Sequence, residues 1–223
     1  MKSNPLATRY VAPGKIPWHS HRGPTLGQLH SKFVGQLHCR AAIVGPHGSG
    51  KSTLLEHLVP MLGTIALRRS TVNWGEQPRA ADTVVPFQNV PSGELRSVVW
   101  LRLRGRSASG RLLLETRSEW ARPGRLLVID GYEQLSHFRR WRAMWLTRSS
   151  RTGLLVTAHH PTWLPTLIET HVDAALAQQV LEQLLSEDAV DRARMLDAHR
   201  LAKLLEKHHG NLRELFMELY DEF

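Results

Sequence analysis

The amino-acid sequence predicts an α/β fold in which helices cover both faces of a parallel β-sheet. Three observations support this prediction. Short apolar runs recur along the chain, stretches with helical periodicity separate them, and the total of 223 residues is enough for a sizeable core. Strands that alternate with helices are typical of parallel sheets, because a parallel connection needs a crossover that is usually helical.

The strands are expected where apolar or β-branched residues cluster between turn signals. These runs lie at 41–44, 64–69, 95–103, 126–129, 154–157 and 166–172. Helical patterns lie at 25–37, 51–62, 108–121, 133–147 and over most of 174–223. We therefore divide the chain into an extended N-terminal arm (1–39), a core domain (40–173) and a helical C-terminal region (174–223).

The helix expected at 133–147 carries large apolar residues along one face. Leu135, Phe138, Trp141 and Trp145 recur there at helical spacing. This pattern predicts that the face is buried, together with Trp100 in the strand expected at 95–103.

The C-terminal helices have recognisable boundaries. Asp173 and Ser186 are candidate N-caps, since their side chains accept hydrogen bonds from free backbone N–H groups. Gly210-Asn211 marks a break before the last helix.

Charge is unevenly distributed along the chain. The net charge is +9, of which residues 1–152 carry +15 and residues 153–223 carry −6. This asymmetry favours contact of the basic front half with nucleic acid or with a protein partner, while a generally arginine-rich surface is the alternative interpretation. No apolar run approaches the roughly 18 residues of a membrane-spanning helix, and the first residues lack an apolar signal stretch. We therefore expect a cytoplasmic protein without membrane contact.

One motif points to chemistry. Residues 45–52 read Gly-Pro-His-Gly-Ser-Gly-Lys-Ser and match the phosphate-loop pattern G-x-x-x-x-G-K-[ST] at every fixed position, between an expected strand and an expected helix. The glycines let backbone N–H groups turn toward a triphosphate, the lysine reaches the β- and γ-phosphates, and the last serine binds Mg²⁺. The expected nucleotide-binding residues are Gly45, Pro46, His47, Gly48, Ser49, Gly50, Lys51, Ser52 and Thr53.

A second element is the apolar run Leu126–Ile129 followed by Asp130. A carboxylate at the carboxyl end of a parallel strand lies at the edge where open α/β sheets bind ligands. Asp130 is therefore expected to hold Mg²⁺ together with Ser52, as the Walker-B residue of a nucleotide site. The alternative is that Asp130 caps the following helix.

With these two motifs the chain resembles the P-loop ATPases that keep an additional strand between the two Walker strands, a branch that includes the AAA+ and STAND ATPases. The resemblance covers roughly residues 40–220. It implies a three-layer P-loop fold with a small C-terminal helical lid, and it implies ATP and Mg²⁺ as ligands.

The resemblance also implies roles for three further residues. Thr157, which ends the apolar run Leu154–Val156, corresponds to a sensor residue that contacts the nucleotide. Arg213, in the sequence Gly210-Asn211-Leu212-Arg213-Glu214-Leu215, is similar to the arginine by which a lid contacts the nucleotide. Glu133 is a candidate to polarise water, and Lys51 is expected to assist catalysis as well as binding. Here Gly131 follows Asp130 where the family usually has glutamate, so capping of the next helix is an equal alternative for Glu133.

The leading hypothesis is thus an ATP-binding protein, a Mg²⁺-dependent ATPase that uses its nucleotide state as a switch. Two alternatives stay open: a small-molecule or nucleotide kinase, which uses the same phosphate loop, and an ATP-regulated nucleic-acid-binding protein. A GTPase is disfavoured because the chain has no N-K-x-D sequence to recognise guanine.

Overall fold

The computed structural model describes residues 4–20, 23–62, 66–71, 97–103, 121–185 and 197–221. The helix expected at 108–121 lies almost entirely outside these residues, and so does the expected N-cap Ser186. Within the described ranges, no helix combines the length and apolar character needed to cross a bilayer. The chain forms two compact units, which are described in turn.

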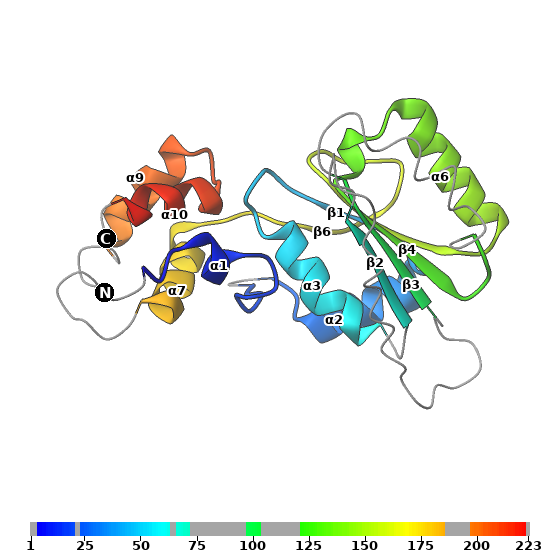
Figure 1. Cartoon of the computed structure of the whole chain (residues 1–223), viewed down its shortest axis with the longest axis horizontal. Coiled ribbons are helices and arrows are strands. Elements are labelled where there is room, and N and C mark those ends of the chain that lie inside the picture. Colours follow the sequence, from blue (N-terminus) through cyan, green and yellow to red (C-terminus); the bar gives the residue numbers. More distant parts are fainter. Residues whose placement is uncertain are drawn as a thin grey trace. The chain divides into compact units, whose positions relative to one another are not determined.

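One unit comprises Gly27–Val44 and Leu58–Ile168 and contains most of the sheet (Figure 1). Parallel pairing joins five strands in the order β2-β3-β4-β5-β1, and a sixth strand, β6, follows β1. The strands are β1 (Arg40–Val44), β2 (Ala66–Thr71), β3 (Ser97–Arg102), β4 (Arg125–Asp130), β5 (Gly153–Ala158) and β6 (Thr166–Glu169). The α/β class and the six expected strands are confirmed. β5 lies between β1 and β4.

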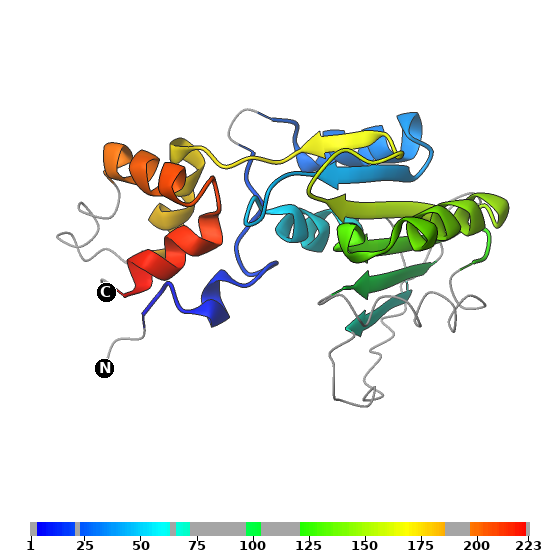
Figure 2. The ribbon, with the colours of Figure 1, turned by 90° about the horizontal axis from the view of Figure 1, so that it is seen from above.

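The central strands are buried on both faces, which explains their unbroken apolar runs. Every residue of β5 is buried, as are the last four of β1 and the last five of β4. The helix α6 (His137–Ser149) lies on one side of the sheet, and α2 (Leu26–Ser31) with the π-helical turn η1 (Lys32–Gln36) lies on the other (Figures 1 and 2). On the α2 side, Nζ of Lys32 donates to the Leu167 carbonyl at 2.7 Å.

The helix α6 faces the sheet with small residues and not with its aromatic ones. Ala143, Leu146 and Thr147 are buried against the sheet. The Arg40 guanidinium, on β1, donates to Oγ1 of Thr147 at 3.0 Å and to the Thr152 carbonyl at 3.2 Å. Apolar contacts of Ala143 and Leu146 and a hydrogen bond from Arg40 to Thr147 thus hold the helix on the sheet.

The prediction that Trp141 and Trp145 are core residues is therefore wrong. Trp141 is 48% exposed, Trp145 is 54% exposed and Phe138 is 64% exposed, whereas Trp100 on β3 is buried as expected. Residues 143, 146 and 147 have helical spacing just as residues 138, 141 and 145 do, so periodicity alone could not decide which stripe faces the sheet.

The other unit combines three separate stretches of chain: residues up to Leu26, Gly45–His57, and Glu169 onward. Its helices are α1 (Thr8–Val11), the start of α3 (Lys51–Met61), α7 (Ala174–Leu184), α9 (Ala198–Lys207) and α10 (Leu212–Tyr220). Asp173 caps α7 by accepting from Leu176 N–H, and Asn211 caps α10, so the expected cap and the expected break are both confirmed.

The first described residues of the chain pack on its C-terminal helices. Leu6 is buried in an apolar cluster with Leu201, Leu215 and Leu219 of the last two helices. The Asn4 side-chain amide donates to the Tyr220 carbonyl at 3.0 Å. The structure thus places the start of the chain in the same compact unit as its C-terminal helices.

Candidate functional site

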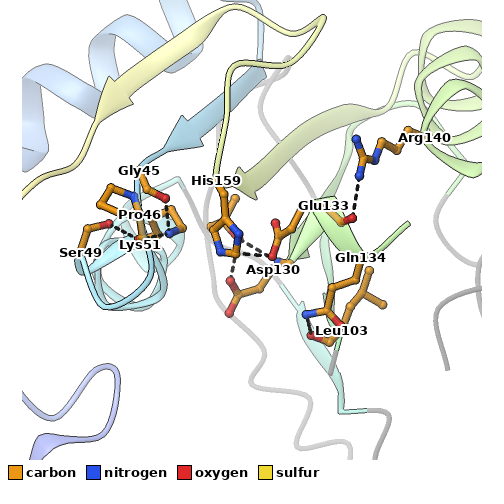
Figure 3. Close-up of polar contacts among 12 residues, drawn as sticks. Gly45, Pro46, Ser49, Lys51, Leu103, Asp130, Glu133, Gln134, Arg140 and His159 are labelled. Atoms are coloured by element: carbon orange, nitrogen blue, oxygen red, sulfur yellow. Dashed lines mark hydrogen bonds and ion pairs between the residues drawn. The ribbon is translucent and has the colours of Figure 1, made fainter. Parts of the chain in front are cut away.

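The loop at Gly45–Gly50, called the phosphate loop here after the sequence pattern that it matches, leaves β1 and ends where α3 begins at Lys51. Gly48 and Gly50 have φ angles of +69° and +86°, a region that side chains disfavour. Lys51 is buried, and its Nζ donates to the carbonyl oxygens of Gly45 and Pro46 at 2.6 Å each (Figure 3). The ammonium group is therefore satisfied within the loop, at the end where the helix dipole favours anions.

A threonine just beyond β6 contacts the beginning of the loop. Ser49 Oγ donates to the Pro46 carbonyl at 2.8 Å and lies 2.7 Å from Oγ1 of Thr170. A Cβ atom on Gly45 would overlap with Oγ1 and the carbonyl oxygen of Thr170. Thr170 was not predicted from the sequence, because a threonine after a strand carries no signal of a loop contact.

The N-terminus of α10 contacts the middle of the loop. A Cβ atom on Gly48 would overlap with Oδ1 of Asn211 and would lie 3.0 Å from the Leu212 backbone nitrogen. Asn211 Oδ1 also accepts from the backbone N–H of Arg213 at 3.1 Å. Arg213 is exposed, and its predicted contact with a nucleotide stays a prediction. Asn211, predicted only as a helix break, is thus also a neighbour of the phosphate loop.

The β4 turn, residues Asp130–Gln134, is built around a buried carboxylate. Asp130 is 8% exposed, its Oδ1 accepts from Oγ1 of Thr157 at 2.7 Å, and its Oδ2 accepts from Nε of Arg102 at 3.1 Å. Arg102 is the register partner of Asp130 on β3, and Thr157 follows Val156, which pairs with Ile129. Arg102 on β3 and Thr157 on β5, the strands on either side of β4, therefore each donate to one oxygen of the Asp130 carboxylate.

The hydroxyl of Thr157 has a second partner in the same turn. Its Oγ1 accepts from the backbone N–H of Gly131 at 2.8 Å while its proton is donated to Asp130. The predicted contact of Thr157 with a nucleotide stays a prediction; in this structure the hydroxyl orients Asp130. The alternative role of Asp130 as a helix cap is wrong, because α6 begins at His137 and Ser136 occupies its N-cap position.

Glu133 lies in the 3₁₀ turn η2 (Tyr132–Gln134) and is partly buried. Its Oε1 lies 3.4 Å from Nε2 of His159, in the segment after β5 (Figure 3). The turn is fixed by Arg140, whose Nη2 donates to the Glu133 carbonyl at 2.6 Å, and by Gln134, whose amide donates to the Leu103 carbonyl at 2.7 Å. Glu133 precedes the N-cap of α6, so the prediction that it might cap that helix is wrong.

Burial in the surroundings of η2 changes the pKa of Tyr132. Burial raises the pKa of Tyr132 to about 12, although Arg140, whose guanidinium lies 5.8 Å from the ring centroid, opposes this rise. The Tyr132 hydroxyl donates to the Arg140 carbonyl at 3.0 Å and stays protonated at neutral pH. The same turn therefore holds an ionisable acid, Glu133, next to a phenol that remains neutral.

The residues expected to hold Mg²⁺ have suitable chemistry. Ser52 provides a hydroxyl on the first turn of α3, and Asp130 provides a carboxylate whose orientation is fixed by two hydrogen bonds. Hydroxyl and carboxylate oxygens are the hard ligands that Mg²⁺ prefers. A comparison of the chain with protein-family models gives no match, and a comparison with curated proteins gives none either.

Proposed function

We propose that this protein binds ATP with Mg²⁺ through the phosphate loop and hydrolyses it, using its nucleotide state as a switch. In this proposal the fold is the three-layer arrangement of P-loop ATPases with a C-terminal helical lid. The observation that carries the proposal is the loop itself: a complete motif with two glycines at positive φ, leading into a helix whose first residue is a buried lysine.

The contacts of Lys51 support a role in binding phosphate. Its ammonium group is held by two carbonyl oxygens of the loop, so it is already desolvated and oriented. Phosphate oxygens carry more negative charge than carbonyl oxygens, so their attraction for the ammonium group is stronger. ATP would therefore recruit Lys51 from these carbonyl groups, and the exposed His47 and Pro46 would border the bound phosphates.

The order of the strands also supports the proposal. Because β1, β5 and β4 run parallel, their carboxyl ends lie at one edge of the sheet, the edge at which open α/β sheets bind ligands. The strand β5 between β1 and β4 has the position of the additional strand in the ATPase branch that the sequence resembles.

Ser52 and Asp130 would hold the Mg²⁺ ion. When bound, the ion neutralises charge on the phosphate oxygens of ATP. Thr157 and Arg102 act on this function as positioning residues, since they fix the carboxylate of Asp130 from both sides.

Glu133 is the residue that would orient the attacking water. Its carboxylate is partly buried, and His159 is close enough to restrain it. Arg140 and Gln134 fix the backbone of the turn on either side. A carboxylate held in this way can accept a hydrogen bond from water and align its lone pair.

The switch would operate through the contact between the loop and α10. Asn211 packs on Gly48, and Arg213 follows two residues later. A change in the loop on binding or loss of the γ-phosphate would therefore be transmitted to the start of α10, where Arg213 could interact with the added charge.

The decisive experiment is Lys51→Ala, with ATP affinity measured by calorimetry in the presence of Mg²⁺. We expect a loss of about 10- to 100-fold, because a hydrogen bond to a charged group contributes about 1.5–3 kcal/mol. Lys203→Ala, an exposed lysine on α9, is the matched control and should bind ATP normally. Unchanged affinity of Lys51→Ala would contradict the proposal. Release of phosphate without any added acceptor would distinguish an ATPase from a kinase.

A further inference from the structure

The exposed face of α6 carries three aromatic rings that the fold does not use. Phe138, Trp141 and Trp145 are 64%, 48% and 54% exposed. Their neighbouring ring centroids lie 6.1 Å and 6.4 Å apart, with interplanar angles of 29° and 14°. The residues follow at i, i+3 and i+7, so the rings form a continuous row along about two turns of the helix.

This row is not part of the packing that holds α6 on the sheet. That packing uses Ala143, Leu146 and Thr147, on a different stripe of the helix. Three large aromatic side chains in one exposed row are uncommon on a monomer surface and typically mark an interaction site. We therefore expect this surface to bind a partner, and its charge indicates the chemical class of that partner.

Arginines lie within and beside the row. Arg148 continues the same stripe at i+10 from Phe138, and Arg142 lies between Phe138 and Trp145 on the helix surface. Neither guanidinium has a hydrogen bond or ion pair with another residue in the part of the chain that the structure describes, and Nε of Arg142 is buried without an acceptor there. The sequence from Gln134 to Ile168 contains no aspartate or glutamate. We name the surface formed by Phe138, Trp141, Arg142, Trp145 and Arg148 the α6 strip.

We propose that the α6 strip binds single-stranded nucleic acid. Unpaired bases stack on exposed aromatic rings regardless of their sequence, and guanidinium groups neutralise the phosphates between them. The strip presents aromatic rings and guanidinium groups next to one another on a single helix. Backbone N–H groups and specific base contacts are not needed for such binding, so the expected preference is for single strands over duplexes and not for one sequence.

A membrane surface is a poorer match to the same residues. A helix that lies in a bilayer interface separates its aromatic residues from its cationic ones, which stay on the polar face. Here Arg142 and Arg148 share the stripe of the aromatic rings, so insertion of the rings would carry guanidinium groups toward hydrocarbon. Single-stranded nucleic acid can contact such a mixed stripe without moving guanidinium groups into hydrocarbon, because its bases stack on the rings and its phosphates pair with the arginines.

The proposal does not depend on the nucleotide site. The α6 strip lies on a helix that contains none of the residues assigned to ATP or Mg²⁺. Lys51→Ala should therefore leave the binding of single strands intact in the absence of ATP, even if it abolishes ATP binding.

The test uses fluorescence anisotropy with the full chain and a labelled oligothymidylate of about 16 nucleotides, the upper end of common single-strand site sizes. We expect the double variant Trp141→Ala/Trp145→Ala to bind at least about tenfold more weakly, since each stacked base contributes about a factor of ten. Trp141→Phe/Trp145→Phe keeps two aromatic faces and should recover most of the affinity. Trp163→Ala removes a still more exposed tryptophan outside the strip and serves as the control.

Salt dependence provides a second readout. Arg148→Ala should reduce the slope of log affinity against log salt by about 0.7, the value for one phosphate contact on a single strand. Lys203→Ala, on α9, should leave this slope unchanged. Because the substituted residues are exposed, the thermal unfolding midpoints of the variants should stay close to the parent value.

Four results would overturn the proposal. They are absence of binding at low salt, equal affinity of the double alanine variant and the parent, an equal loss in Trp163→Ala, and a preference for duplex over single strands. If the double alanine variant instead lost binding to vesicles of anionic phospholipid, or lost self-association measured by sedimentation, the strip would belong to a membrane or to a second copy of the chain.

Discussion

The phosphate loop and the β4 turn both begin where a buried parallel strand ends, yet they are held in different ways. In the loop, Lys51 donates to carbonyl groups only five and six residues away. In the β4 turn, the carboxylate of Asp130 depends on Thr157 and Arg102, which lie 27 and 28 residues away along the chain. The loop therefore has a local sequence signature, whereas the turn takes its geometry from the register of three strands.

The largest expected effect separates the chemistry of the two regions. If the loop binds the phosphates and the β4 turn orients water, Glu133→Gln should keep ATP affinity and lower the turnover rate by about 10²–10⁴-fold, the usual contribution of a positioned acid or base. Steady-state phosphate release and calorimetry on the same preparation measure the two quantities.

Glu214→Gln, an exposed carboxylate on α10, is the matched control and should turn over at the parent rate. If Glu133→Gln also hydrolysed ATP at the parent rate, Glu133 would be a structural residue of the turn, and the chemistry would have to be assigned elsewhere.

A smaller effect tests whether a contact with a distant part of the chain stabilises the loop. Gly48 and Gly50 have similar positive φ angles, but a Cβ atom on Gly48 meets Asn211, whereas nothing lies within 4 Å of one on Gly50. In the absence of nucleotide, Gly48→Ala should therefore destabilise the protein by about 1–3 kcal/mol more than Gly50→Ala, because only the former must displace packed atoms.

Denaturant unfolding of the two variants measures this difference. Equal stabilities would mean that α10 moves away from the loop without loss, so that the contact with Asn211 would not stabilise the loop.

An effect of similar size concerns the β4 turn. Thr157→Val keeps the shape of the buried side chain but leaves the Gly131 N–H without its acceptor, so we expect a loss of about 1–3 kcal/mol in the free energy of unfolding. Thr157→Ser keeps the hydroxyl and should retain most of this stability. The Mg²⁺ dependence of ATP binding should also weaken in the valine variant, because Asp130 loses one of the groups that orient it.

If valine and serine were equally stable, the hydroxyl of Thr157 would have no structural role in the turn. Its predicted contact with the nucleotide would then be the better explanation for a polar residue at this buried position.

Much of the sheet could be predicted from the sequence, because strands buried on both faces must be apolar throughout. The course of the loop at 45–50 was predictable for a related reason: Gly48 and Gly50 adopt positive φ angles that side chains disfavour. Its binding of phosphate stays a prediction. The partners of Asp130 were not predictable, since Arg102 and Thr157 reach it only through strand pairing. Thr170 and Asn211 contact the loop across even longer stretches of chain, and neither belongs to the motif.

The error in α6 has a different origin. Two stripes of the helix have the same helical period, and the larger residues of the aromatic stripe led to the wrong prediction of which stripe is buried. On the stripe that faces the sheet, the Thr147 hydroxyl accepts a hydrogen bond from Arg40. Hydrophobic periodicity does not contain such a polar contact, and it therefore could not identify this stripe.

The unit that contains the phosphate loop also has a consequence for biosynthesis. Leu6 packs with Leu201 and Leu215, and the loop packs with Thr170 and Asn211, so this unit joins the first residues of the chain to some of the last. A ribosome adds about 5–20 residues per second, and roughly 10–30 s therefore separate translation of Gly48 from that of Asn211. Until Asn211 and Leu215 are translated, the nascent chain contains Leu6 without its apolar partner Leu215 and a loop without its contact to Asn211. The loop is translated early, but the contacts that support it form only later.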